Sequence, residues 1–307
     1  MSIQIENFMH LPIYILIIII CGSCIKEVHK QPVFEGTKLI VNGFICPDSL
    51  VRVHVSLSHA LAQQPPELNS AQVTLFENGV VIGDFQYQGN GWYVNPIYPE
   101  VNKTYEIKVE NDGYTSVAAV TQIPQMPQNL TGIYYKTSSV PFEDPSGTMV
   151  FPTQTKIEFD DAAAKANFYE FGNNTFLYET SEETDPSLLS DGDLSYNPST
   201  YYCSDLLFNG THKTLLLQKG GNVFLNFGVT FFDANYKRLF KSCSPEYYQF
   251  RKSWTKHLYN QQTNDPIEDP VNLLFYGDPV VMYSNVIGGY GVFAGYNAIQ
   301  LPIVYVE

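Results

Sequence analysis

Apolar and polar residues alternate along much of the chain, a pattern typical of strands with one buried face. Between Leu50 and Leu57, valine or leucine fills every second position and a polar or charged residue fills most of the others. The same period recurs from Thr104 to Val109, and turn sequences such as Asn78-Gly79 separate the runs at sandwich spacing. We therefore predict that residues 37–124 form one immunoglobulin-like or transthyretin-like β-sandwich.

The pattern changes after Pro124 and Pro127, which mark a linker. Farther on, aromatic and aliphatic residues recur at spacings of three and four after Ser244, a pattern typical of an amphipathic helix with a serine N-cap and a proline at its first position. We predict a second β-rich domain over 130–307 with one packed helix over 245–260, the fold being mainly β. Strands or strand pairs are expected at 132–136, 155–159, 168–178, 215–218, 223–232 and 280–285.

The N-terminus carries the pattern of a lipoprotein signal peptide. Ile13 to Ile20 is apolar, too short to span a bilayer but of the length of a signal-peptide core. Gly22 and Ser23 then precede Cys24, and small residues before a cysteine are the pattern that lipoprotein-processing enzymes recognise. We predict removal of residues 1–23, lipid modification of the Cys24 thiol, and a polar tether over 24–36.

Two features depart from that pattern. Cys21 stands where an aliphatic residue is usual, and the segment before the apolar run has no Lys or Arg but carries Glu6. Translation from Met9 would remove Glu6, so both Met1 and Met9 are candidate starts. The alternatives to lipid modification are a secretory signal cleaved elsewhere and an uncleaved N-terminal anchor.

Composition narrows the function classes. The 31 Asp and Glu residues outnumber the 17 Lys and Arg, which gives a net charge of −14. Nucleic-acid binding needs clustered cations, so we predict no nucleic-acid partner. Aromatic residues make up 14% of the chain and charged residues 16%, which suits a β-rich protein exported from the cytoplasm.

Three cysteines follow Cys24. An oxidising compartment permits one disulfide, and we predict the pair Cys203–Cys243 because both lie in the second half of the chain. Cys46 ends an apolar strand and is expected to be a small buried residue. Beyond the signal peptide the sequence contains no C-x-x-C pair and no zinc-type Cys/His spacing, so we predict no metal and no cofactor.

The sequence shows no nucleophile or metalloprotease motif, and we predict that the protein is not an enzyme. The enzymatic alternative is a surface hydrolase that uses paired carboxylates, chosen among Asp160, Asp161, Glu268 and Asp269. His54 falls on the solvent face of its strand. The acidic stretch 191–193 lacks the spacing of a calcium loop, so a solvated loop is expected.

Several stretches together resemble the domain of unknown function 4249 family. They include LIVNGFI, AQVTLFENG and NKTYEIKV in the first half, and SPEYYQF and SNVIGGYGVFAGY in the second. The resemblance implies a lipoprotein of Bacteroidota-type bacteria, lipid-anchored in the outer membrane on its periplasmic or cell-surface side. The resemblance also implies that the protein acts together with a TonB-dependent outer-membrane transporter. It assigns no catalytic residues to this sequence.

We therefore expect a non-catalytic accessory or ligand-binding subunit of such a transporter or of another envelope protein. A purely structural envelope lipoprotein is the second alternative, beside the hydrolase. The expected contact surfaces are the polar loop 180–200 and the Gly-rich segment 288–296, which could present Tyr290 and Tyr296. Phe293 in the same segment is expected in the core.

Overall fold

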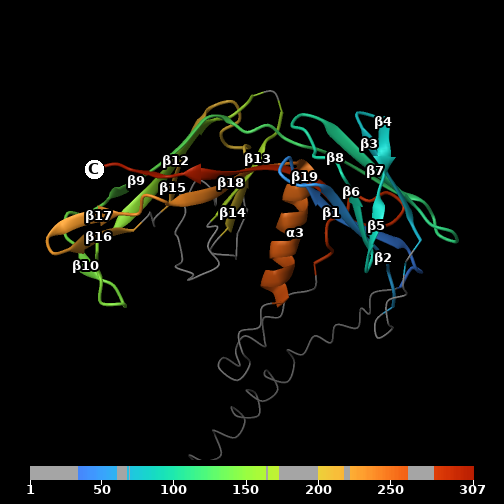
Figure 1. Cartoon of the computed structure of the whole chain (residues 1–307), viewed down its shortest axis with the longest axis horizontal. Coiled ribbons are helices and arrows are strands. Elements are labelled where there is room, and N and C mark those ends of the chain that lie inside the picture. Colours follow the sequence, from blue (N-terminus) through green and yellow to red (C-terminus); the bar gives the residue numbers. More distant parts are fainter. Residues whose placement is uncertain are drawn as a thin grey trace, which may run out of the picture. The chain divides into compact units, whose positions relative to one another are not determined.

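The computed structural model describes residues 34–60, 68, 70–163, 165–172, 200–217, 222–261 and 280–307. Residues 1–35 and 36–307 are separate units, and every element below belongs to the second (Figure 1). Its described residues form several β-sheets and one helix, which confirms the predicted fold class.

The N-terminal part is a sandwich of two sheets. One sheet has the order β5-β6-β2-β1-β19 and the other the order β4-β3-β7-β8. The inward residues of both sheets form one core, in which alternate residues of β2, from Val51 to Leu57, are almost fully buried. The strand bounds are β1 (Leu39–Ile45), β2 (Val51–Leu57), β3 (Gln72–Glu77), β4 (Val80–Asp84), β5 (Gln86–Gly89), β6 (Trp92–Asn95), β7 (Thr104–Glu110) and β8 (Val117–Gln122).

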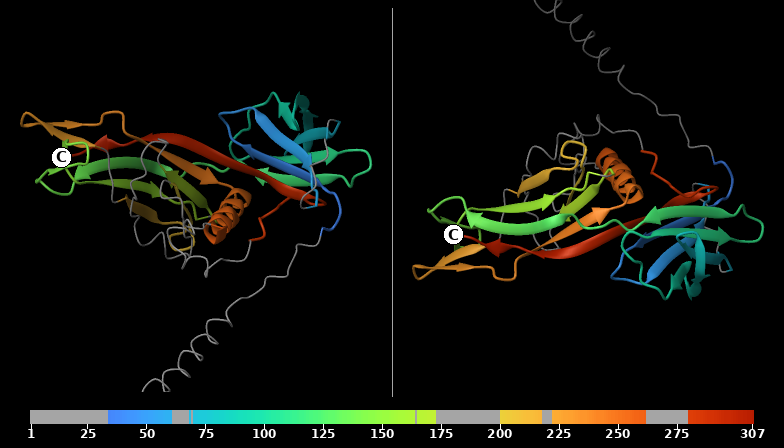
Figure 2. Two further views of the ribbon diagram at one scale, coloured as in Figure 1. Left: turned by 90° about the horizontal axis from the view of Figure 1, so that it is seen from below. Right: turned by 90° about the horizontal axis from the view of Figure 1, so that it is seen from above.

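The long strand β19 (Tyr290–Pro302) pairs with strands from two parts of the chain. Its first half runs parallel to β1 and its second half antiparallel to β18 (Lys237–Cys243), so one sheet continues through both (Figure 2). Phe293 is fully buried in the sandwich core. The division into 37–124 and 130–307 stays a prediction, and β19 supplies a sandwich strand from outside the first range.

The remaining strands enclose a second core, in which aromatic rings pack closely. Phe159 contacts Phe240 edge-on at a centroid distance of 5.4 Å. The sheet orders are β15-β12-β9-β20, β10-β11-β16-β17, and β14-β13-β18 leading into β19. The bounds are β9 (Gln128–Lys136), β10 (Phe142–Glu143), β11 (Met149–Val150), β12 (Thr153–Asp160), β13 (Phe168–Gly172), β14 (Thr200–Ser204), β15 (His212–Leu217), β16 (Val223–Asn226), β17 (Val229–Phe232) and β20 (Val304–Tyr305).

The helix α3 (Pro245–Gln261) begins where the sequence predicts. The backbone N–H of Tyr247 donates to Ser244 Oγ at 3.2 Å, which is an N-cap bond. The helix packs against β19 and β13 and buries Tyr247 and Tyr248, whereas Trp254 is partly exposed. Within the described residues, no helix is long and apolar enough to cross a membrane.

Two strand predictions were wrong. The stretch 223–232 is a hairpin, because Phe227 and Gly228 form a two-residue turn between β16 and β17. Residues 280–285 form no strand. Instead, the Asn285 side chain accepts from Phe293 N–H at 2.9 Å and donates to Phe293 C=O at 2.8 Å. These side-chain bonds take the place of the backbone hydrogen bonds that a paired strand would make. The strand pair predicted over 168–178 begins as β13, and its remainder lies outside the described residues.

The predicted Cys203–Cys243 disulfide was also wrong, because both residues are buried cysteines that form no disulfide. They lie on β14 and β18, on either side of β13, where they pair with Tyr169 and Phe168 respectively. Two strand spacings of about 4.8 Å separate them, and consecutive β13 residues face opposite sides of the sheet. A disulfide requires Cα atoms within about 7 Å, so this geometry precludes one. Cys46 is buried, as predicted.

Candidate interaction surface

The structure does not bring Tyr290 and Tyr296 together on one open surface. Tyr290 is partly exposed at the start of β19, where its hydroxyl accepts from Lys38 Nζ at 3.2 Å. Tyr296 contacts the ring of Tyr247 on α3 and the ammonium group of Lys241, with centroid distances of 5.4 and 5.1 Å. Tyr296 therefore helps to seat the helix. The other predicted contact, loop 180–200, lies outside the described residues except for its last residue, which begins β14.

A buried carboxylate fixes α3 to the sheet. Glu170 of β13 is almost completely buried and forms ion pairs with Lys241 of β18 and with Arg251 of α3, whose Nε lies 3.1 Å from Glu170 Oε2. The Tyr247 hydroxyl donates to the same carboxylate at 3.2 Å. Burial and the charge of Glu170 raise the pKa of Tyr247 well above its usual range, so the hydroxyl stays protonated.

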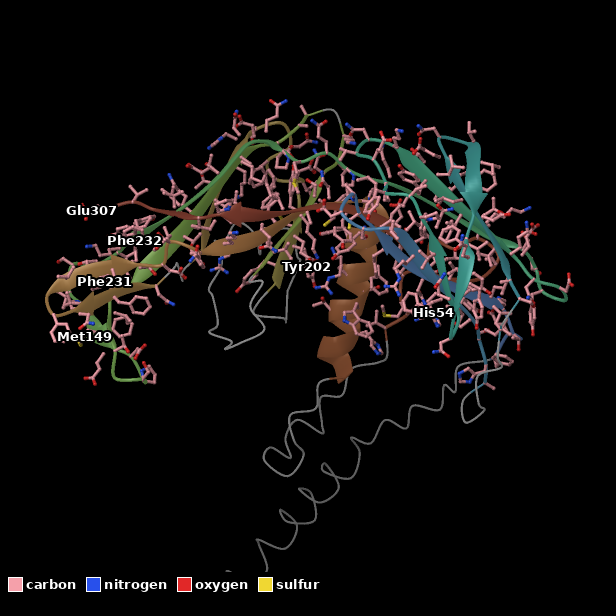
Figure 3. The ribbon with its side chains drawn as sticks, viewed as in Figure 1. His54, Met149, Tyr202, Phe231, Phe232 and Glu307 are labelled. Carbon is pink, nitrogen blue, oxygen red and sulfur yellow. The ribbon has the colours of Figure 1, made fainter. Side chains whose placement is uncertain are left out.

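Arg251 is not a solvent-exposed residue of the helix. It lies largely buried against Glu170 and over the Tyr202 ring (Figure 3 labels Tyr202). Because Lys241, Arg251 and the Tyr247 hydroxyl all donate to the Glu170 carboxylate, and each of its oxygens has a charged donor, the cluster is a satisfied structural network.

The carboxylates of the hydrolase alternative do not converge. Asp160 is exposed and lies 2.7 Å from His212 Nδ1, and this neighbour raises the pKa of His212. Asp161 is buried and accepts from Tyr169 OH at 2.5 Å and from Gly210 N–H at 2.8 Å. The two neighbouring carboxylates thus have separate partners. Glu268, Asp269 and residues 191–193 lie outside the described residues.

A second buried carboxylate near Asp161 could not be anticipated from the sequence. Asp205 accepts from the backbone N–H of Asn167 at 2.8 Å, and its own N–H donates to Asn167 C=O at 3.0 Å. Burial, with the charge of Asp161 added, raises the pKa of Asp205. Asp161 accepts from a backbone N–H of the loop between β14 and β15, and Asp205 accepts from one just before β13, so both carboxylates fix loop structure.

Within the described part of the chain, no group of three or more His, Cys, Asp or Glu is placed to hold a metal ion. His54, expected on a solvent face, is half-buried, with its ring against Trp92 and Nε2 3.1 Å from the carbonyl of Asn90 (Figure 3 labels His54).

A pocket of about 250 Å³ lies beside the N-terminus of α3 and is lined by residues such as Lys165, Phe168, Ser242 and Pro245. Small-molecule sites in proteins enclose about 300–1,000 Å³ and combine apolar walls with several converging polar groups. This pocket is smaller than that range, so it offers weak support for a small-molecule site.

Among the described residues, several exposed apolar side chains lie on the four-stranded sheet β10-β11-β16-β17 (Figure 3 labels Phe231 there). Cross-strand pairing places Phe142 opposite Val150, Val150 opposite Phe224, and Phe224 opposite Phe231. Directly paired residues point to the same face, so these four side chains form one row across all four strands.

The two ends of this row are exposed: Phe142 by 51% and Phe231 by 52%. Val229 lies two residues before Phe231 and extends the same face towards the hairpin turn, where Phe227 is 99% exposed. We call Phe142, Val150, Phe224, Phe227, Val229 and Phe231 the aromatic face.

Phe232 points to the other side of the sheet. It pairs with the fully buried Val223 and stacks on Tyr305 at a centroid distance of 5.2 Å. On this side of the hairpin Val223 is buried, although Phe232 remains 53% exposed. On the other side, within the aromatic face, Val150 is buried, whereas Phe142, Val229 and Phe231 are each more than half exposed. Exposed apolar patches of this kind mark interaction sites more often than isolated surface residues do.

The chain belongs to the family described as Domain of unknown function (DUF4249), which matches residues 26–300. No curated protein matches the chain. Among solved structures, the chain has a match to native alpha-2-macroglobulin from Escherichia coli, spanning domains MG0-NIE-MG1. The identity is 10% over 70% of this chain and 79% of the other, with a TM-score of 0.20.

Proposed function

We propose that the mature chain is a lipid-anchored, non-catalytic accessory subunit of the outer membrane that binds a second envelope protein. The observation that carries the proposal is the aromatic face, because a protein with no partner gains nothing from exposing Phe142, Phe227 and Phe231 to water. A TonB-dependent transporter is the partner that the family resemblance favours.

The local chemistry supports binding over catalysis. Asp161, Glu170 and Asp205 are each held by structural hydrogen bonds, and the exposed pair Asp160–His212 lies on a strand surface. A hydrolase would need groups that converge on a substrate. Detection of hydrolytic activity that is lost in Asp160→Asn would favour the paired-carboxylate alternative.

The N-terminus supports action at a membrane. The 12 residues from Ile25 to Gly36 could extend on the order of 40 Å, at up to ~3.5 Å per residue. Lipid attachment at Cys24 would confine the protein near its partner, and this effective concentration would allow a modest contact to be occupied.

Replacing Cys24 with alanine is expected to release the protein from the membrane fraction, because no acyl chain can then be attached. Cys46→Ala is the matched control, because Cys46 is buried and should leave the distribution unchanged. Equal membrane retention of wild type and Cys24→Ala would show that the anchor lies elsewhere. Purification from solubilised membranes tests the binding role, and repeated recovery of wild type with no envelope protein would favour a purely structural lipoprotein.

A further inference from the structure

A buried hydroxyl without a hydrogen-bond partner lies at the pocket beside the N-terminus of α3. Ser242 of β18 is 2% exposed, and its Oγ has no hydrogen-bond partner among the residues that the structure describes. The same residue lines the pocket. Leaving a buried hydroxyl unpaired costs free energy, and such groups are uncommon in folded proteins. A ligand in the pocket would supply the missing partner.

The side chain of Ser242 points to the side of the sheet on which the pocket lies. Ser242 pairs with Asn297 of β19, and Gly295 lies two residues before Asn297, so all three residues face the same side. A Cβ built on Gly295 would lie 2.6 Å from the carbonyl oxygen of Gln122, which also lines the pocket. The unpartnered hydroxyl is therefore directed towards the wall that Gln122 forms.

The charge at the pocket is positive. Of the described residues that line it, Lys165 alone is charged, and its Nζ donates to Gln122 Oε1 at 3.5 Å, a long and therefore weak bond. The N-terminus of α3, at Pro245, adds the partial positive charge of the helix dipole. Glu246 in the first turn opposes that partial charge, but its carboxylate accepts from Thr121 Oγ1 at 3.0 Å and is not part of the lining. The pocket therefore favours an anion.

Apolar side chains form much of the remaining wall, among them Pro124, Phe168 and Cys243. Lys165 is exposed and Ser242 is buried, so the pocket extends from the surface inwards. Its volume of about 250 Å³ equals that of about eight liquid water molecules, which admits a ligand of roughly eight to ten non-hydrogen atoms. The volume thus excludes a drug-sized compound and sets the size of the ligand.

We propose that this pocket binds a small carboxylate that carries a compact apolar group. The ammonium group of Lys165 pairs with the carboxylate, the Ser242 hydroxyl donates to one of its oxygens, and the apolar group contacts Phe168. A doubly charged phosphate would leave one charge uncompensated beside apolar walls. This chemistry has two sources, a free carboxylic acid and the C-terminal residue of a peptide. The inference goes beyond the proposed function, which concerns a protein partner at the aromatic face.

Isothermal titration calorimetry of the full-length chain, purified in detergent with its lipid anchor, tests the inference with 4-methylpentanoate as the probe. The expected result is saturable binding of one equivalent. Binding should be at least about tenfold weaker for 4-methylpentanamide, which lacks the charge, and for acetate, which lacks the apolar group. The inference is overturned if 4-methylpentanoate shows no saturable binding, or if the amide or acetate binds as tightly as 4-methylpentanoate.

Two variants assign the binding to this pocket. Lys165→Met and Ser242→Ala should each weaken binding of 4-methylpentanoate, by at least about tenfold and severalfold respectively. Lys108→Met is the matched control, because Lys108 pairs with Glu110 on the sandwich and should leave the affinity unchanged. Unchanged affinity in Lys165→Met or in Ser242→Ala would overturn the inference.

Thermal unfolding separates a binding role of Ser242 from a structural one. Ser242→Ala should unfold at the same temperature as the ligand-free wild type or at a higher one, because the hydroxyl has no bond within the described fold to lose. A variant that unfolds at a lower temperature and binds the probe as tightly as wild type would show that the hydroxyl serves the fold alone, which contradicts the proposal.

Peptide probes distinguish the two sources of the carboxylate. Binding of acetyl-alanyl-leucine, but not of its C-terminal amide, would assign the pocket to peptide C-termini, whereas binding of 4-methylpentanoate alone would assign it to free acids; both outcomes support the shared chemistry. Lys165→Met should still recover the envelope protein in the same amount as wild type. Failure of the carboxylate site therefore leaves the proposed function standing, and failure of that recovery in wild type leaves the carboxylate site standing.

Discussion

Replacing Glu170 with alanine is expected to lower the free energy of unfolding by roughly 3–5 kcal/mol. The substitution leaves Lys241 and Arg251 largely buried without their common carboxylate, and the Tyr247 hydroxyl loses its acceptor. The helix α3 should loosen first, since Arg251 and Tyr247 both belong to it.

Chemical denaturation monitored by tryptophan fluorescence measures this effect. The chain has two tryptophans, Trp92 in β6 and Trp254 in α3, so a Trp92→Phe background reports on the helix alone. The matched control is Glu110→Ala, which removes an exposed ion pair with Lys108 (2.7 Å) and should cost at most about 1 kcal/mol. Equal losses for the two variants would show that the buried network does not hold the helix.

The second large effect is expected at Gly291, which lies opposite Val41 in the parallel pairing of β19 with β1. Its φ is +112°, and a Cβ there would lie 2.1 Å from the carbonyl oxygen of Val41. Gly291→Ala should therefore combine backbone strain of about 1–3 kcal/mol with a similar cost of steric overlap, roughly 2–6 kcal/mol together.

Two glycines separate these contributions. Gly79 has a φ of +80° with no atom within 4 Å of a built Cβ, so Gly79→Ala isolates the strain. Gly295→Ala isolates the overlap, because its Cβ would lie 2.6 Å from the Gln122 carbonyl oxygen and no left-handed φ is involved. Hydrogen exchange of the β1 amides should accelerate in Gly291→Ala and not in Gly79→Ala. A Gly291→Ala variant as stable as Gly79→Ala would contradict the close approach of β19 to β1.

The local pattern of apolar and polar residues was sufficient to locate those strands and the helix start that depend only on their own residues. The two-residue period located β2, β7 and β12, and Ser244 with Pro245 located the start of α3. The strand β18 was missed because Arg238 and Lys241 interrupt its apolar pattern. Arg238 is nevertheless buried, with its guanidinium group over the ring of Tyr236 two residues earlier, and Lys241 pairs with Glu170 of β13, which is distant in the sequence.

The other differences between prediction and structure depend on how distant segments are placed in the fold. The disulfide prediction used sequence position alone, which cannot tell that β13 separates Cys203 from Cys243. The hairpin over 223–232 was missed because Phe227 is not a turn-forming residue, although Gly228 after an apolar run was an available signal. The exposure of Phe231 could not be predicted either, because periodicity assigns a side chain to a face without showing what covers that face.

The most direct test of the central claim is quantitative co-purification from solubilised membranes with the lipid anchor intact. The double variant Phe227→Asn/Phe231→Thr removes two exposed rings of the aromatic face, whereas Tyr98→Asn removes a comparably exposed ring of the sandwich. We predict that wild type and Tyr98→Asn recover the same envelope protein in equal amounts, and that the double variant recovers at least about tenfold less while remaining folded and membrane-bound. Equal recovery by all three proteins would contradict the claim that this subunit binds its partner through the aromatic face.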